Sequence, residues 1–293
     1  MDKFYPVLQT CWDWRAAGNF MFGGTGSALM LMIAIDSYPG TPPLETGLIA
    51  LAFIGLGLLL VWIELGRPWR FLHVYFHPQT SWMTREASVA ILLFPIALIG
   101  IVFKIPVMIT MAGVLGLVFL YCQGRILLAS KGIPSWREPV VLPLIISSGL
   151  AEGAALLLLS SLIIDSAPGW MLYLLLVLLA IRIQSWNRYR RQLAVSKAPE
   201  KTLQVLSGIH ATTFLGGNVL PFILVSVSLV MPDLMVLLVS VASILTVMSG
   251  WHMKFTIVVH AAQQQGYSLG KLRRGRPVIT PPVRRKPDKF VFK

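Results

Sequence analysis

The sequence predicts an all-α integral membrane protein, a polytopic bundle of about eight transmembrane helices with both termini in the cytoplasm. The chain of 293 residues is 56% hydrophobic and only 13% charged, with a mean hydropathy of +0.73. A soluble domain carries about 25% charged residues. Apolar windows long enough to cross ~30 Å of hydrocarbon recur along the chain. Lys and Arg, which give a net charge of +13, gather in alternate loops, as is typical of membrane proteins.

Each predicted span is an apolar window that ends at charged residues, prolines or loop sequence. The seventh window contains Gly216-Gly217-Asn218 and Pro221, so we expect a broken helix there. Such breaks are tolerated where neighbouring helices or a cavity satisfy the freed backbone groups. In chain order the windows are Ala17–Ile35, Leu44–Ile63, Ala87–Phe103, Val107–Ala129, Val140–Ile164, Trp170–Ser185, Ile209–Val230 and Leu234–Val258.

Loop charge predicts the orientation of the bundle. With an even number of spans, both termini and every second loop share one side, and Lys104 alone among the 25 Lys and Arg residues falls on the other. The charged side should therefore face the cytoplasm of a bacterial or archaeal cell, across its cytoplasmic (inner) membrane. Its cations are Lys3, Arg15, Arg67, Arg70, Arg85, Arg125, Lys131, Arg137, those between Arg182 and Lys201, and those from Lys271 to Lys293.

Composition divides the chain into a transmembrane domain, residues 1–262, and a basic, proline-rich cytoplasmic tail, residues 263–293. One interpretation of the tail is an arm attracted to anionic lipid. The other is an extended arm that lies on an acidic partner subunit. Phe290, Val291 and Phe292 favour the partner, because a solvated arm gains nothing from them.

Cysteine usage limits the cofactors of this chain. Cys11 and Cys122 are far apart and form no CxxC pair, so we expect no iron–sulfur cluster and no metal site here. Both are predicted at the cytoplasmic side, where thiols stay reduced, so a disulfide is not expected.

Ionisable groups inside spans are costly and are functional candidates by default. Here they gather toward one side, which predicts a polar pocket open to the cytoplasmic end only. A proton pump or ion transporter would need polar stations through the whole membrane, whereas a one-sided pocket suits a lipid-soluble molecule that meets a cytoplasmic partner. The groups near the cytoplasmic ends are Asn19, Glu64, Glu86, Arg125, Arg182, His210, His252 and Lys254, with Glu152 a few turns further in.

The densest polar stretch, WIELGRPWR followed by His73 and SWMTRE, lies between the second and third spans. Quinone reduction needs two electrons, two protons, and groups that hydrogen-bond the carbonyls and relay protons. Such groups are Glu64, Arg70, His73 and Glu86. Gly66, Arg67 and Pro68 would support the turn. In the alternative interpretation the arginines are interfacial anchors, and the carboxylates pair with them to stabilise the turn.

The pattern ELGRPxR, followed about fifteen residues later by SWxxRE, resembles the DmsC-like branch of the NrfD-like membrane subunits of DMSO-reductase-type molybdoenzymes. The resemblance extends to the eight-span layout. It implies that Gly66, Pro68, Arg70 and Glu86 match the family's motif residues. Glu64 departs from it, because DmsC has a histidine there. Asn19, in AAGNFMFGGTG, resembles a polar first-span position that lines the quinone pocket.

The resemblance implies a membrane anchor that binds a quinone (menaquinone or ubiquinone) and exchanges electrons with an iron–sulfur subunit, itself wired to a molybdopterin catalytic subunit. Terminal-substrate catalysis would lie in that partner. Because the predicted partners are cytoplasmic, the chain resembles, among the cytoplasmic examples of this group, the membrane subunits of phenylacetyl-CoA:acceptor oxidoreductases. That resemblance implies electron flow from the substrate into the quinone.

Two other functions stay open at this point. His210 and His252 lie at similar depth in the last two spans and would serve a haem b anchor, and with Glu152 they mark a possible additional pocket. A small-molecule transporter is the other alternative, although transporters tend to carry internal repeats and the LGRP turn has no second copy.

Overall fold

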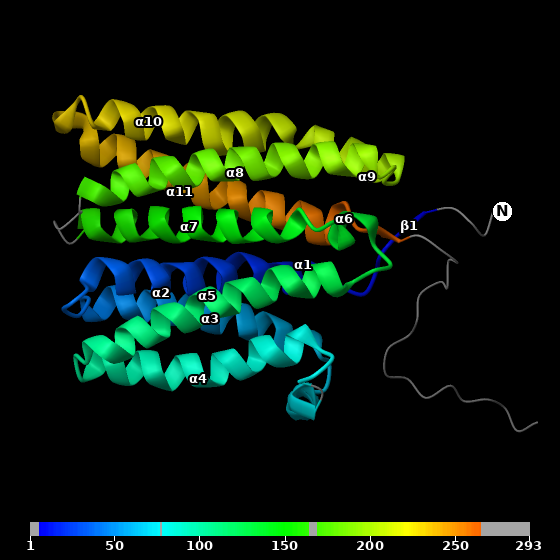
Figure 1. The fold of residues 1–293 in the computed structure, drawn as a ribbon, viewed down its shortest axis with the longest axis horizontal. Coiled ribbons are helices and arrows are strands. Elements are labelled where there is room, and N and C mark those ends of the chain that lie inside the picture. The colour runs from blue at the N-terminus through cyan, green and yellow to red at the C-terminus, as the bar shows by residue number, and fades with distance from the viewer. Residues whose placement is uncertain (1–5, 77, 164–168, 265–293) are drawn as a thin grey trace, which may run out of the picture.

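The computed structural model of the protein describes residues 6–76, 78–163 and 169–264. Its long helices run side by side along one axis (Figure 1). Among the described residues, seven helices are long and apolar enough to cross a membrane, and a bent helix pair makes an eighth candidate span. The prediction of an all-helical, multi-pass membrane bundle is confirmed.

The first half of the chain forms four spans. The first span is interrupted by a π-helical segment, η1, in which the backbone ladder is locally widened. α4 begins at Ser81, whose hydroxyl accepts a hydrogen bond from the Thr84 amide at 3.3 Å, and α5 begins with a proline, which fits the first helical turn. The elements are α1 Trp14–Gly18, η1 Asn19–Gly23, α2 Gly24–Ser37, α3 Leu44–Glu64, the 3₁₀ helix η2 Pro68–Phe76, α4 Trp82–Val102, α5 Pro106–Ala129 and the short α6 Pro134–Arg137.

The second half contains the broken seventh span. α9 and the helix formed by η3 and α10 meet at a bend of 40° between Gly208 and Thr212. The break expected at Gly216-Gly217-Asn218 is instead a stretch of π-helix within η3. α8 runs to Val195, beyond the predicted end at Ser185, because Arg, Gln, Leu and Ala continue a helix readily outside the hydrocarbon. The elements are α7 Val141–Ile163, α8 Gly169–Val195, α9 Glu200–Gly208, η3 Thr212–Val219, α10 Leu220–Ser228, η4 Pro232–Leu234, α11 Met235–Phe255 and the π-helical η5 Thr256–His260.

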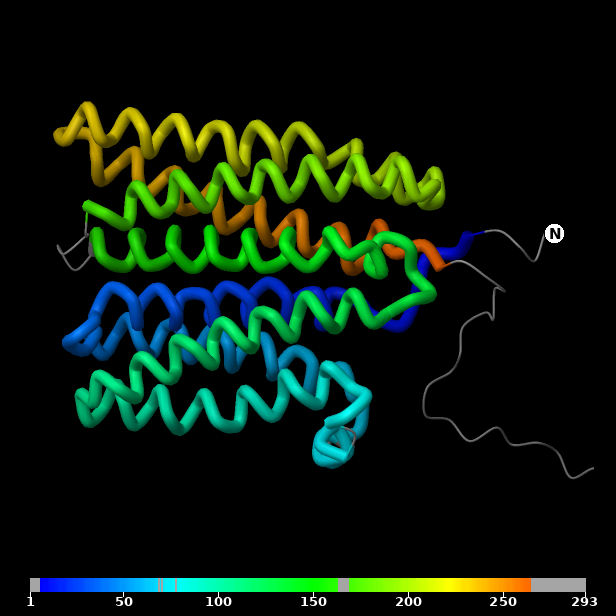
Figure 2. The backbone as a smooth tube through the Cα atoms, in the orientation of Figure 1, coloured from blue at the N-terminus to red at the C-terminus, as the bar shows by residue number. Residues whose placement is uncertain are grey.

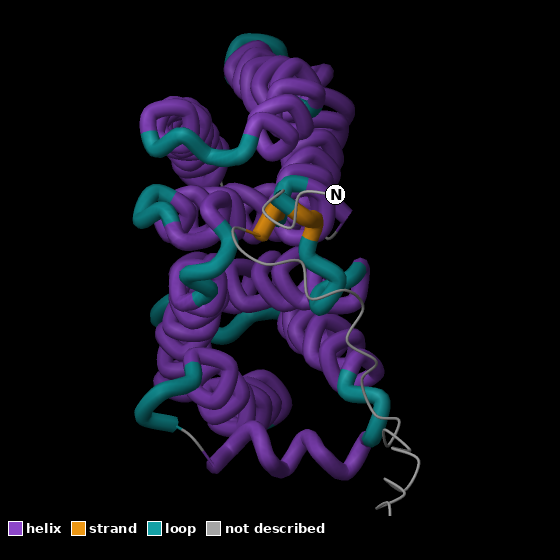
Figure 3. Tube along the Cα trace, turned by 90° about the vertical axis from the view of Figure 1, so that its right-hand side faces the viewer, coloured by secondary structure: helices purple, strands orange, loops and turns teal. Residues whose placement is uncertain are grey.

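Two short strands join the ends of the described chain. β1 (Val7–Leu8) pairs antiparallel with β2 (Gln263–Gln264), and the strands lie at one end of the bundle (Figure 3). The start of the first span and the end of the last therefore lie at the same end, as an even number of spans requires. Residues 265–293, most of the predicted tail, lie outside the described residues.

The bundle is centred on its first and fifth spans, of which 78% and 72% are buried, against 33–50% for the other unbroken spans. Small residues allow this close packing. A Cβ on Gly153 of α7 would lie 2.6 Å from the backbone of Ala28 in α2, closer than real Cβ atoms come. Packing through small residues is how membrane helices gain van der Waals contact where lipid provides no hydrophobic driving force.

Candidate functional site

A cavity of about 540 Å³ lies between α3, η2 and α4. η2 lies toward the end of the bundle at which the described chain begins and ends (Figure 2). The rim includes Trp62, Met83 and Ile91, which are 42%, 38% and 55% exposed, so the cavity opens toward the lipid-facing surface. Its lining residues are Asn19, Leu58, Val61, Trp62, Leu65, Phe71, Val74, Tyr75, Met83, Glu86, Ala87, Ala90, Ile91 and Phe94.

Two buried polar side chains form the inner wall of this cavity. The Asn19 Nδ2 amide donates a hydrogen bond of 3.0 Å to Glu86 Oε1, and the two residues are only 4% and 5% exposed. Gln123 of α5 donates from Nε2 to the Asn19 carbonyl oxygen at 2.8 Å. The Asn19 Oδ1 atom has no hydrogen-bond partner among the described residues. Unsatisfied buried polar groups are costly, so this wall retains capacity for a polar ligand.

Local backbone geometry brings Asn19 to Glu86. Asn19 opens the π-helical η1, and π-turns occur frequently at functional sites. Gly57 of α3 permits the approach, since a Cβ there would lie 2.6 Å from the Gly23 backbone nitrogen and 3.0 Å from Asn19 Oδ1.

The turn between α3 and α4 is held by backbone contacts. Gly66 has φ +66°, a conformation that glycine adopts without strain. The Thr84 hydroxyl donates to the Val74 carbonyl oxygen of η2. Arg85 donates to the carbonyl oxygens of Pro78 (2.9 Å) and Gln79 (2.8 Å). Arg85 is therefore a structural anchor of the turn rather than a group that lines the cavity.

Three other residues of the predicted turn, Glu64, Arg67 and His73, are not among the described residues that line the cavity. Glu64 is half-buried at the end of α3, while Arg67 and His73 are exposed. The side chains of Pro68 and Arg70 lie outside the described part of the chain. Among the predicted quinone ligands, the structure thus brings Asn19 and Glu86 together at the cavity and leaves Glu64 and His73 off its wall.

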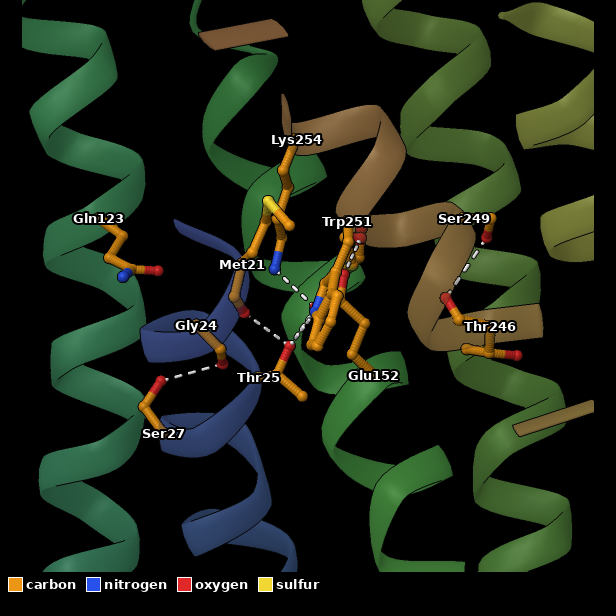
Figure 4. A network of polar contacts seen from close by, with 12 residues as sticks. Met21, Gly24, Thr25, Ser27, Gln123, Glu152, Thr246, Ser249, Trp251 and Lys254 are labelled. Atoms are coloured by element: carbon orange, nitrogen blue, oxygen red, sulfur yellow. Dashed lines mark hydrogen bonds and ion pairs between the residues drawn. The ribbon is translucent and has the colours of Figure 1, made fainter. Parts of the chain in front are cut away.

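A second polar cluster lies deeper in the bundle, around Glu152 (Figure 4). Lys254 Nζ is 2.7 Å from Glu152 Oε2, and both side chains are fully buried. Thr25 and Ser148 donate hydroxyl hydrogen bonds to the same carboxylate at 2.6 and 2.7 Å. The Trp251 indole in turn donates to Thr25 Oγ1 at 2.9 Å. Every oxygen of this buried carboxylate therefore has a partner.

Arg182 forms a neighbouring buried centre without a carboxylate in direct contact. Its guanidinium donates to Asn218 Oδ1 at 2.6 Å, to the Thr246 carbonyl oxygen at 3.0 Å, to Ser249 Oγ at 3.0 Å and to the Gly217 carbonyl oxygen. The π-helical η3 presents the Gly217 carbonyl oxygen and the Asn218 side chain to this cation. The glycine and asparagine of the broken span thus have a role in solvating a buried arginine.

The predicted histidine pair has separate surroundings. His210 Nδ1 accepts a hydrogen bond from Trp186 Nε1 at 3.1 Å, and His252 is exposed on α11. Within residues 6–264, gaps excepted, no group of three or more His, Cys, Asp and Glu side chains is arranged to hold a metal ion. Glu152 belongs to the cluster with Lys254, not to a pocket with these histidines.

The cavity walls come from the first three spans and η2. Residues 5–113 match the family model described as polysulphide reductase, NrfD. The chain is a multi-pass membrane protein, and its residues 5–113 are similar to the NrfD family. The matched segment contains every residue that lines the cavity. No curated protein matches the chain. The predicted resemblance to NrfD-like membrane subunits is supported over this segment, and the finer DmsC-like assignment stays a prediction.

Sequence reasoning missed two polar contributors near the cavity. Gln123, on the fourth span, donates a hydrogen bond to the main-chain carbonyl oxygen of Asn19. Tyr75 lines the cavity from η2. A glutamine within an apolar window is a visible signal. Tyr75 gave none, because a tyrosine in an interfacial loop is ordinary.

Proposed function

We propose that the cavity binds the head group of a membrane quinone, and that this subunit exchanges electrons between the quinone and an iron–sulfur subunit on the cytoplasmic side. The observation that carries the proposal is the Asn19–Glu86 pair, a buried amide and carboxyl at the inner wall of an otherwise apolar cavity. Ligand sites of this kind are mostly apolar, with a few placed polar groups.

The lining fits a quinone in two respects. Exposed apolar side chains at the rim give a lipid-soluble molecule a lateral entry from the hydrocarbon, and aromatic rings of Trp62, Phe71 and Phe94 offer faces to a planar head group. A bound quinone supplies two-electron, two-proton chemistry. In its protonated form, the Glu86 carboxyl donates a hydrogen bond to a carbonyl oxygen. In its ionised form it accepts the proton of a hydroxyl.

Glu86→Gln tests this role, because it keeps the size and the hydrogen bond with Asn19 but removes the exchangeable proton. We expect the purified complex to assemble normally and to lose quinone-coupled turnover by about 10²- to 10⁴-fold, the usual contribution of a positioned acid or base. Reduction of an artificial acceptor by the partner subunits should be unchanged. Glu200→Gln, the same change on the exposed start of α9, is the matched control. Wild-type quinone turnover in Glu86→Gln would refute the assignment.

We further infer that the complex resembles a phenylacetyl-CoA:acceptor oxidoreductase, with an iron–sulfur subunit and a molybdopterin catalytic subunit in the cytoplasm. The support is the charge asymmetry of the loops, which directs the cavity end toward the cytoplasm. Co-purification tests it: a hydrophilic partner with many cysteines should accompany the chain. Isolation of the chain alone, with solute transport in vesicles, would instead indicate a transporter.

A further inference from the structure

Polar groups line the described cavity from more than one wall, and one of them is the indole of Trp62 on α3. Asn19 and Glu86 belong to the inner wall, on η1 and near the start of α4. η2 forms another wall with Phe71, Val74 and Tyr75, of which Tyr75 alone has a polar side chain. A para-quinone has its two carbonyl oxygens at opposite ends of the ring. One polar cluster therefore cannot serve both oxygens, and a second donor on a different wall is required to satisfy the other.

Tyr75 is held in place relative to Glu86. The Thr84 hydroxyl donates to the carbonyl oxygen of Val74, the residue before Tyr75, and Thr84 lies two residues before Glu86 on α4. η2 is thereby tied to the helix that carries the carboxyl. A donor that is already fixed in this way can orient a ligand, because a mobile side chain would lose conformational entropy when the ligand binds.

The Tyr75 hydroxyl is available. The side chain is half-buried and lines the cavity, and its hydroxyl has no hydrogen-bond partner among the described residues. Burial also raises the pKa of Tyr75 above its ordinary value of 10.0, so the hydroxyl keeps its proton and stays a donor at physiological pH. A partly buried hydroxyl without a partner gains a hydrogen bond when a carbonyl oxygen enters the cavity.

We propose that Tyr75 is a further quinone ligand, whose hydroxyl donates a hydrogen bond to the carbonyl oxygen facing η2, while Asn19 and Glu86 serve the opposite carbonyl. This inference rests on the proposed function of the cavity. Tyr75 orients the head group and keeps its own proton throughout. The exchangeable proton at the inner wall remains that of Glu86.

The experiment uses the purified complex in lipid nanodiscs and a short-chain naphthoquinone labelled with ¹³C at one carbonyl or the other. Tyr75→Phe removes only the hydroxyl. It should raise the KM for the quinone about two- to tenfold, the weight of one neutral hydrogen bond, with little change in kcat. In infrared difference spectra, one of the two carbonyl bands should move to higher frequency. The effect should be the same at all pH values below the ordinary pKa of 10.0.

Two further variants separate hydrogen bonding from packing. Tyr173→Phe, an exposed tyrosine on α8, is the matched control and should leave KM and both bands unchanged. Tyr75→Leu removes the ring as well and should raise KM further. If Tyr75→Phe matches wild type while Tyr75→Leu is impaired, the residue only packs, and the inference is overturned.

The two proposals fail in distinguishable ways. Unchanged KM and carbonyl bands in Tyr75→Phe, together with lost quinone turnover in Glu86→Gln, would refute Tyr75 and retain the quinone site. If the quinone binds equally well in both variants, with both carbonyl bands unmoved, the cavity itself is not the quinone site.

Discussion

The buried ion pair between Glu152 and Lys254 allows a quantitative test of how this bundle tolerates charge. Lys254→Met removes the cation, while Thr25 and Ser148 still donate to the carboxylate at 2.6 and 2.7 Å. The pair is fully buried at 2.7 Å, so no water replaces the lost ammonium. Removing one partner of such a pair costs about 3–5 kcal/mol. We expect a loss of this size in the free energy of unfolding.

The test is completed as a double-mutant cycle by two more variants, Glu152→Gln alone and Glu152→Gln combined with Lys254→Met. The amide retains contacts with the two hydroxyls but leaves Lys254 without its counter-charge, so this single variant should also lose about 3–5 kcal/mol. In the double variant neither member of the pair is left without its partner, while Arg182 keeps its hydrogen bonds to uncharged groups. The double variant should therefore lose much less than the sum of the single losses. The coupling energy is obtained from a double-mutant cycle of denaturant unfolding in detergent micelles.

A surface ion pair provides the control. Arg15 and Asp13 are also 2.7 Å apart, but their side chains are 28% and 43% exposed. Asp13→Asn keeps the hydrogen-bond acceptor that begins α1 and removes only the charge. Exposed pairs contribute about 0–1 kcal/mol, so this variant should be near wild type. Additive losses at Glu152 and Lys254, or a cost no larger than that of Asp13→Asn, would refute the reasoning that burial makes this pair strongly coupled.

Two further predictions concern packing and capping. Gly153→Ala should lower the free energy of unfolding by about 1–3 kcal/mol, the usual cost of overpacking, because the added Cβ would lie 2.6 Å from the Ala28 backbone. Gly216→Ala is the control, since no atom lies within 4 Å of a Cβ there. Equal losses in the two variants would contradict the packing argument. Ser81→Ala should cost about 1 kcal/mol by removing the cap on the Thr84 amide, measured by chemical denaturation, and no loss would show that the cap is dispensable.

Much of the fold could be predicted because lipid imposes simple requirements on a sequence. Apolar windows gave the spans, since every crossing segment must satisfy its own backbone. Window ends were less accurate: α8 continues to Val195, because hydropathy locates the edge of the hydrocarbon and not the end of a helix. The glycines and asparagine of the seventh window predicted a break, but they lie in the π-helical η3, and the bend of this span comes earlier, between Gly208 and Thr212.

The candidate site was predictable in part. Asn19 and Glu86 stood out as polar residues at the ends of apolar windows, and a contact between them could only be inferred through the family resemblance. Glu64 and His73 share the same polar stretch but lie off the cavity wall. Sequence proximity could not separate them from Glu86, because η2 and the turn around Gly66 decide which side chains face inward.

The ion pair between Glu152 and Lys254 could not be predicted from the sequence. Glu152 and Lys254 are both visible as ionisable residues in apolar windows, yet their 102-residue separation gives no register between α7 and α11. The pairing depends on side-by-side packing of these helices, which small residues control. Gly250 illustrates this, since a Cβ there would lie 2.8 Å from Glu152 Cδ, so that a larger side chain would displace the carboxylate.

The π-helical segments explain how the two polar clusters approach each other through an apolar bundle. A Cβ on Gly24, directly after η1, would lie 2.7 Å from Gln123 Oε1 and 3.1 Å from Lys254 Nζ. Gln123 belongs to the cavity side, through its bond to Asn19, and Lys254 to the deeper cluster. The side-chain ends of Gln123 and Lys254 therefore both lie close to the backbone of Gly24. The widened turn of η1 and the missing side chain at Gly24 provide the space, so the first span determines the geometry of both clusters.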